Sequence, residues 1–208
     1  MRGFVPTPSP IVDLMVDKLF EGRPPRRGSR LLDPGCGPGA FIDGVLRRCS
    51  HNHLEVPQIV GVELDPERAA AAAARFRGVP NVSIVREDFL RPTDRRFDYV
   101  IGNPPYVSIT SLGEAEKAAF RKEFLTARGR FDLYLLFFEQ ALRLLAPGGR
   151  LVFITPEKFL YVKTAEPLRR LFARLDVRDL LEVHPGLVRS FSRWIAGRVR
   201  DVERARGR

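Results

Sequence analysis

Hydrophobic and polar positions along the chain alternate between short apolar runs and longer amphipathic stretches. The short runs predict strands at residues 29–33, 58–64, 81–85, 97–101, 150–155 and 179–183. Apolar residues at helical spacing predict helices at residues 9–20, 40–48, 66–77, 113–125, 132–145 and 164–174. Strands that alternate with helices in this way are typical of an α/β fold with a mostly parallel sheet and helices on both faces.

Acidic residues stand at the ends of the first three predicted strands. Asp33 ends the first strand, Glu63 lies near the end of the second, and Asp88 follows the third. In open α/β sheets a ligand binds beyond the carboxyl ends of the strands, where the strand order reverses. Glu63 can accept both hydroxyl groups of a ribose. Asp88 can accept the exocyclic amine of an adenine while Phe89 packs on its ring, so we expect a nucleoside cofactor.

A glycine-rich loop, Pro34-Gly35-Cys36-Gly37-Pro38-Gly39, follows the first predicted strand. Its glycines let the backbone approach a ligand closely. A nicotinamide dehydrogenase would need helix N–H groups open to a pyrophosphate. Here the acidic residue Asp33 precedes the loop, and Pro38 removes one of the backbone N–H donors at the start of the helix. Both features favour a zwitterionic or cationic ligand over a pyrophosphate. We interpret Cys36 as a small packing residue rather than a nucleophile.

The four residues Asn103-Pro104-Pro105-Tyr106 end the fourth predicted strand. Asn103 offers a carbonyl acceptor and two N–H donors. The prolines fix φ and carry no backbone N–H, so nearby carbonyl groups can face a ligand. Tyr106 supplies a ring on which a planar group can stack. The pattern therefore predicts a site for a flat molecule that carries an NH2 group.

Composition adds weaker constraints. The net charge of +10 fits a polyanionic partner, although an arginine-rich coding bias would produce the same excess. Two cysteines form neither a disulfide framework nor a metal cluster, and His51 and His53 have no neighbouring metal-ligand residues, so we expect no metal. With no apolar run near the ~20 residues of a membrane helix, we expect a cytoplasmic protein.

Taken together, these motifs resemble those of the S-adenosylmethionine-dependent N6-adenine DNA methyltransferases of the gamma class, which share a Rossmann-like class I methyltransferase fold. The motifs span residues 4–160 in the order of that family. They are Thr7-Pro8-Ser9-Pro10, Leu31 to Phe41, Gly61-Val62-Glu63-Leu64-Asp65, Glu87-Asp88-Phe89, Asn103 to Tyr106, Phe131-Asp132-Leu133-Tyr134, Pro147-Gly148-Gly149 and Leu151 to Pro156.

The resemblance implies a role for each matched residue. The methionine end of S-adenosylmethionine would lie against Thr7, Asp33 and the loop residues Gly35, Cys36 and Gly37. Glu63 would hold the ribose, Leu64 would pack on the adenine ring, and Asp88 with Phe89 would recognise its edge. In the catalytic motif, Asn103 and Pro105 would lie where cofactor and substrate meet. The Asn103 side chain and the Pro104 carbonyl would accept the N–H groups of a flipped adenine, and Tyr106 would stack on it.

The chain departs from this family after about residue 183. We expect the methyltransferase domain to cover residues 1–185 and residues 186–208 to form a basic tail, poorly ordered or helical. In that interpretation the antiparallel seventh strand is missing, and the chain is truncated or frame-shifted near Gly186. His184 takes the place of an aromatic residue that helps to hold the flipped base. We expect no target-recognition domain, which leaves three possibilities. A separate specificity subunit supplies DNA recognition, the protein methylates poorly and without specificity, or it is an inactive fragment.

Three alternatives remain open from the sequence. A glutamine methyltransferase that acts on release factors shares the same four residues at 103–106, because an amide NH2 fits the same acceptors. An RNA adenine methyltransferase would use the same chemistry. A remnant that binds cofactor or nucleic acid without catalysis is a different class of answer. The Thr7-Pro8 motif favours DNA adenine among the active enzymes.

Overall fold

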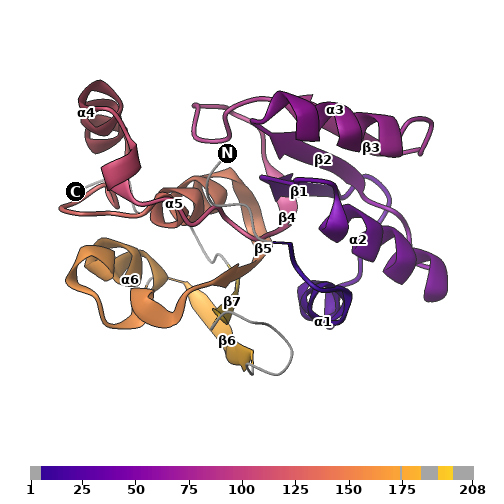
Figure 1. Ribbon diagram of the computed structural model, residues 1–208. Coiled ribbons are helices and arrows are strands. Elements are labelled where there is room, and N and C mark those ends of the chain that lie inside the picture. The colour runs from indigo at the N-terminus through magenta and orange to yellow at the C-terminus, as the bar shows by residue number, and fades with distance from the viewer. Residues whose placement is uncertain (1–5, 174, 184–191, 199–208) are drawn as a thin grey trace.

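A seven-stranded sheet with the order β3-β2-β1-β4-β5-β7-β6 forms the centre of the molecule (Figure 1). The computed structural model describes residues 6–173, 175–183 and 192–198. The strands are β1 (Arg30–Pro34), β2 (Gln58–Glu63), β3 (Val82–Arg86), β4 (Phe97–Gly102), β5 (Leu145–Thr155), β6 (Asp176–Val183) and β7 (Ser192–Arg198). The helices are α1 (Ser9–Phe20), α2 (Ala40–His51), α3 (Pro66–Arg75), α4 (Glu114–Glu123), α5 (Leu133–Leu144) and α6 (Glu166–Phe172), with short 3-10 turns η1 (Ile109–Ser111), η2 (Glu157–Leu160) and η3 (Lys163–Ala165).

Neighbouring residues of each central strand point to opposite faces of the sheet, as the period of two requires. Leu31 and Ile101 pack with α1 and α2 in one apolar cluster, whereas Leu32 and Val100 pack with α5 and α6 in another. These strands are apolar on both faces because helices cover both sides of a parallel sheet. The predicted α/β fold with helices on both faces is confirmed.

One sequence expectation about the sheet was wrong. Residues 192–198 form the antiparallel strand β7, which lies between β5 and β6. Ile195 of β7 is opposite Phe153 of β5 on one side and opposite Leu180 of β6 on the other. A strand that is paired on both sides satisfies its backbone groups through its neighbours, even where arginines interrupt the side-chain pattern. The seventh strand is therefore present. Its expected absence was the reason for inferring a break near Gly186. His184 and the remaining tail residues lie outside the described residues.

α5 ends at Leu144 and β5 begins directly at Leu145, earlier than the predicted strand at residues 150–155, so Pro147-Gly148-Gly149 lies within the first part of β5. Leu145 pairs with Phe97, and a register shift separates this pair from the regular pairing that begins at Tyr99. A Cβ at Gly149 would lie 2.8 Å from the Ala146 carbonyl oxygen, so only glycine fits this bulge. None of the described helices is long and apolar enough to cross a membrane.

Candidate active site

A cavity of about 530 Å3 opens at the carboxyl end of the sheet, where the strand order reverses between β1 and β4. Loops after β1, β2, β3 and β4 form its wall, together with the segment before α1 and parts of η1, α4 and α5. Most of the sequence-predicted cofactor residues line it: Thr7, Gly35, Cys36, Glu63, Leu64, Asp88, Phe89, Asn103 and Pro105. The expectation that separate strand ends converge on one pocket is therefore met.

The glycine-rich loop is held against the end of β2 by backbone hydrogen bonds. The amides of Gly35 and Cys36 both donate to the Val62 carbonyl, at 2.7 and 2.9 Å. Gly39, the N-cap of α2, has a φ of +90°, and a Cβ there would lie 2.2 Å from the Phe76 ring. Glycine is required at this point because both the conformation and the close approach exclude a side chain. The loop thus passes from β1 into α2 directly beneath the cavity.

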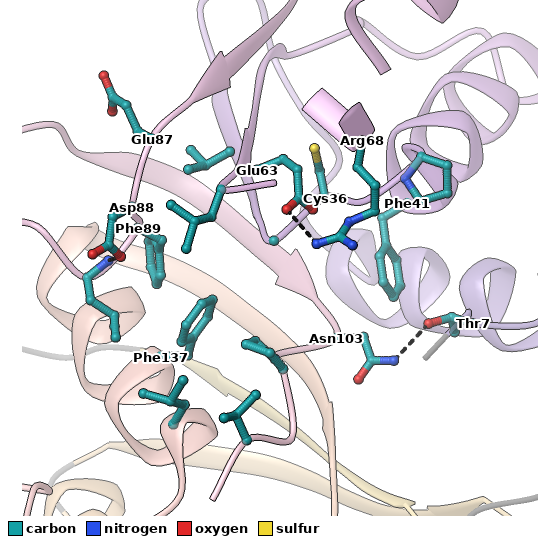
Figure 2. Close-up of a pocket in the computed structure, with 18 of the residues that line it drawn as sticks. Thr7, Cys36, Phe41, Glu63, Arg68, Glu87, Asp88, Phe89, Asn103 and Phe137 are labelled. Carbon is teal, nitrogen blue, oxygen red and sulfur yellow. Dashed lines mark hydrogen bonds and ion pairs between the residues drawn. The ribbon is translucent and has the colours of Figure 1, made fainter. Parts of the chain in front are cut away.

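Glu63 is nearly buried at the end of β2, and its carboxylate accepts hydrogen bonds from three residues. Oε2 accepts from the Gly37 amide at 3.0 Å, and Oε1 accepts from the Asp65 amide at 2.8 Å. Oε1 also accepts from Nη2 of Arg68 at 3.0 Å, and Figure 2 shows this guanidinium extending from α3 to the carboxylate. Gly37 therefore contacts Glu63 instead of lining the cavity.

Asp33 lies in β1, one residue before the glycine-rich loop, and is fully buried. Neither carboxylate oxygen has a hydrogen-bond partner among the described residues. Burial raises the pKa of this carboxyl well above its usual value, and the nearby charge of Glu63 raises it further. Asp33 does not line the cavity. A buried carboxyl without a partner is costly, so it is suited to a cationic group that arrives with a ligand.

The far end of the cavity combines apolar side chains with the two acidic residues Glu87 and Asp88. Leu64 is 51% exposed within it, which is unusual for a leucine beside a buried strand. Oδ1 of Asp88 accepts from the Leu90 amide at 3.0 Å, which fixes the direction of the carboxylate. The Phe89 ring packs against Phe137 of α5 at 4.9 Å between centroids. This combination suits a flat heterocycle with an amine at its edge.

Asn103 lies at the opposite end, where β4 leaves the sheet. Its Nδ2 donates to Thr7 Oγ1 at 3.2 Å, as Figure 2 shows. The Tyr106 hydroxyl lies 2.6 Å from Asn103 Oδ1 and 3.2 Å from the Ile154 carbonyl oxygen, so it can donate to either. Pro105 lines the cavity, whereas Pro104 and Tyr106 do not. Asn103 therefore stands between the cavity and the aromatic residues beyond it.

Tyr106 is half-buried beside a second tyrosine. Its ring meets that of Tyr134 edge to face at 6.4 Å between centroids. The Tyr134 hydroxyl is buried without a hydrogen-bond partner among the described residues, and burial raises the pKa of this phenol. Lys158, paired with Asp132, lies 5.8 Å from the Tyr134 ring centroid. Tyr106 and Tyr134 together form an aromatic wall next to Asn103, and neither of these two rings lines the cavity.

Sequence reasoning missed several residues of the cavity. They are Phe41, Arg68, Leu112, Glu116, Phe120 and Phe137. Phe41 follows the glycine-rich loop by two positions, which was a usable signal. The charged segment 113–130 was interpreted as a phosphate contact or a solvated helix, yet its α4 supplies cavity wall. Cys36 fits the packing interpretation, because burial and the charges of Asp33 and Glu63 raise the pKa of its thiol. Within the described part of the chain no cluster of His, Cys, Asp and Glu could hold a metal ion.

The strand order and the ligand-sized cavity at the switch point define a class I methyltransferase fold. A methyltransferase subunit of a type I restriction-modification system from Streptococcus thermophilus has this fold, with a TM-score of 0.74 at 19% identity over 96% of this chain and 45% of that one. A class I S-adenosylmethionine-dependent methyltransferase from Listeria monocytogenes gives 0.75 at 20% identity, over 94% of this chain and 60% of that one.

The chain belongs to the Eco57I restriction-modification methylase family, whose model matches residues 62–183. It is 34% identical over 197 residues to the type II methyltransferase M.TthHB8I of Thermus thermophilus, across 88% of this chain and 42% of that protein. It is 40% identical over 199 residues to M.XhoI of Xanthomonas vasicola, across 82% of this chain and 36% of that protein. The chain thus spans less than half the length of these two relatives.

Proposed function

We propose that this chain is the catalytic domain of a DNA methyltransferase that transfers a methyl group from S-adenosylmethionine to N6 of adenine. The observation that carries the proposal is the position of Asn103, at the junction of the cavity with the aromatic wall formed by Tyr106 and Tyr134. Membership of a restriction-modification methylase family supports DNA as the substrate. The finer assignment to adenine N6 rests on the motif Asn103-Pro104-Pro105-Tyr106.

The residues present fit S-adenosylmethionine as the ligand. The Asp33 carboxyl is buried without a partner and does not line the cavity, so it would favour a ligand ammonium or sulfonium through its nearby charge and not by direct contact. Glu63 and Leu64 both line the cavity, where Glu63 would accept a ribose diol and Leu64 would pack on an adenine ring. Asp88 with Phe89 would recognise the adenine edge. Thr7 and the loop residues Gly35 and Cys36 would border the methionine end.

S-adenosylmethionine supplies an activated sulfonium methyl group, so the protein must chiefly position the acceptor in line with it. The amine of adenine is a poor nucleophile because its lone pair is delocalised into the ring. Asn103 Oδ1 and the Pro104 carbonyl would accept its N–H groups, and these bonds strengthen as positive charge develops on nitrogen. The mechanism requires no general base. Tyr106 would stack on the base after it has left the duplex.

We propose that selection of the target sequence is supplied from outside the described residues, for example by a partner subunit. Base-edge contacts in the grooves specify sequence, whereas phosphate contacts only position the protein. The described residues are used to build one sheet, its covering helices and the cavity. Weak methylation of many adenine sites by the isolated chain is therefore expected, with strong dependence on salt.

The test is transfer of a labelled methyl group by the purified 208-residue chain to duplex DNA, single-stranded DNA, RNA and a release factor. The expected result is N6-methyladenine in DNA, identified by nucleoside mass spectrometry. Asn103→Ala should lower the rate by about 10²-fold or more, as for loss of one transition-state hydrogen bond. Asn52→Ala, at the far end of α2, is the matched control and should keep the rate. Label in cytosine, RNA or glutamine, or no transfer by cofactor-bound protein, would contradict the proposal.

A further inference from the structure

The guanidinium of Arg68 lies inside the cavity that we assign to the cofactor. Arg68 extends from the first turn of α3, and its Nη2 is 3.0 Å from Glu63 Oε1 (Figure 2). The Glu63 side chain is only 5% exposed, so this ion pair is shielded from solvent on one side. The hydrogen bond to Glu63 is also the main cause of a raised pKa for Arg68. Sequence patterns gave no role to this residue.

We propose that Arg68 occupies the ribose-diol position of the cofactor site, and that a nucleoside binds only by displacing it from Glu63. This inference rests on the proposed function, because it assigns a competitor to the same site. Arg68 is thus a residue that sets cofactor affinity and selectivity, although it touches neither the methyl group nor the acceptor.

The hydrogen bonds of Glu63 explain why Arg68 is the group that must leave. A carboxylate offers about four acceptor positions, and three are filled in this structure. A ribose diol brings two donors, so one present donor has to go. The Gly37 amide is fixed by the glycine-rich loop, and the Asp65 amide is fixed at the start of α3. Arg68 alone of the three donors is on a flexible side chain.

Asp65 provides a second position for the displaced guanidinium. Nη1 of Arg68 already lies 3.7 Å from Asp65 Oδ2, and the Asp65 side chain is more exposed than that of Glu63. Asp65 also caps α3, because its Oδ1 accepts from the Arg68 amide at 3.0 Å. A rotation of the Arg68 side chain towards the rim would keep its charge paired while Glu63 becomes available. The guanidinium therefore has one acidic partner inside the cavity and one at its edge.

Two consequences follow from this arrangement. Arg68 stabilises the ligand-free protein, since a buried Glu63 without a charged partner would be costly. It also lowers the apparent affinity for a nucleoside with a ribose diol, which equals the intrinsic affinity multiplied by the fraction of molecules in which Glu63 is free of Arg68. By the same count, a ligand with both ribose hydroxyls must displace Arg68, whereas a 2′-deoxy ligand brings one donor that fits the fourth acceptor position. Arg68 therefore reduces the preference of the site for an intact ribose.

The test is calorimetric binding of S-adenosylhomocysteine and its 2′-deoxy analogue to the full chain and to Arg68→Met and Arg68→Gln. Both variants should bind S-adenosylhomocysteine about tenfold more tightly, as expected when one charge-assisted hydrogen bond no longer competes. The preference for the ribose over the deoxyribose ligand should grow, because only the diol has to displace Arg68. Arg77→Met is the matched control, since this exposed arginine follows the same helix and should leave binding unchanged.

A second variant tests whether Asp65 receives the displaced Arg68 guanidinium, and it does so without removing Arg68. Asp65→Asn keeps a capping side chain and removes the charge, so it should weaken binding in the wild-type background. The same change should have little effect in the Arg68→Met background. Equal or weaker binding by both Arg68 variants would overturn the inference while leaving the proposed cofactor intact. Absence of binding by every folded variant, checked by circular dichroism, would overturn the proposed function as well.

Discussion

The hydroxyl of Tyr106 lies 2.6 Å from Oδ1 of Asn103, the oxygen that we assign to the adenine amine. This acceptor is therefore within hydrogen-bond range of another donor in the present structure. The Ile154 carbonyl, 3.2 Å from the same hydroxyl, offers Tyr106 an alternative acceptor. A switch of the hydroxyl from Asn103 to Ile154 would free Oδ1 without moving the ring far. The two residues of the catalytic motif are thus coupled before any substrate binds.

Substitutions at Tyr106 should separate its ring from its hydroxyl. Tyr106→Phe keeps the stacking surface and removes the competing donor, so kcat/KM for DNA should stay within about threefold of wild type. Tyr106→Ala removes a base–aromatic contact of about 1–3 kcal/mol and should raise KM by roughly ten- to a hundredfold. Steady-state methylation of a duplex oligonucleotide measures both. An equal loss in the two variants would show that the hydroxyl, not the ring, carries the function.

Thr7 should act on the rate through the orientation of the Asn103 amide. Its Oγ1 accepts from Nδ2 at 3.2 Å, which directs Oδ1 to the opposite side. Thr7→Val removes one neutral hydrogen bond, worth about 1 kcal/mol, and should lower kcat by roughly fivefold. Thr7→Ser retains the hydroxyl and should keep kcat near the wild-type value. If Thr7→Val changes only the cofactor affinity, Thr7 serves the methionine end and does not orient Asn103.

Much of this site could be predicted from the sequence because its positions are tied to strand ends. Asp33, Glu63 and Asp88 each follow an apolar run, and parallel strands end at one edge of the sheet, so their convergence needed no coordinates. The partition of roles among them could not be predicted in the same way. Whether Asp33 faces the cavity or is buried beneath it depends on the path of the glycine-rich loop, which spacing does not reveal.

Two features were not predicted from the sequence, the strand β7 and the position of Arg68, and both depend on contacts that local sequence does not reveal. The segment Trp194-Ile195-Ala196 is a short apolar run among arginines, and its pairing comes from β5 and β6, which are distant in sequence. Long-range pairing leaves little local signal. Arg68 was missed because a flexible side chain can reach back across a helical turn, and sequence spacing predicts the backbone better than the direction of an arginine.

Glu139 should be important for stability, because it ties the segment after α4 to α5. This nearly buried carboxylate accepts from the Leu125 amide at 3.0 Å and from the amide and hydroxyl of Thr126, each at 2.8 Å. It also pairs with Arg143 at 2.5 Å. Glu139→Ala leaves the buried Thr126 amide and the charge of Arg143 without this partner and should lower the free energy of unfolding by about 3–5 kcal/mol. Urea denaturation measures the change, with the exposed Glu123→Ala as control and expected within ~0.5 kcal/mol of wild type.

Asp33 should make the stability of the ligand-free protein fall as pH rises. Burial first, and the charge of Glu63 second, raise the pKa of its carboxyl in the folded state above the ordinary value of 3.8. Between that value and the raised one, the folded protein holds a proton that the unfolded chain has lost. Stability contributed by this group is therefore present at low pH and is lost as pH rises through the window up to the folded pKa.

Asp33→Asn tests this behaviour because the amide resembles the protonated acid and does not titrate. The variant should be more stable than wild type at neutral pH without ligand, and the difference between the two should shrink towards acidic pH. It should also bind S-adenosylhomocysteine more weakly, since a negative charge near the cavity that would favour the ligand ammonium is gone. Urea midpoints across the pH range and calorimetric titration measure the two effects. A constant stability difference with unchanged affinity would mean that Asp33 is a packing residue, and that the cationic end of the ligand lies elsewhere.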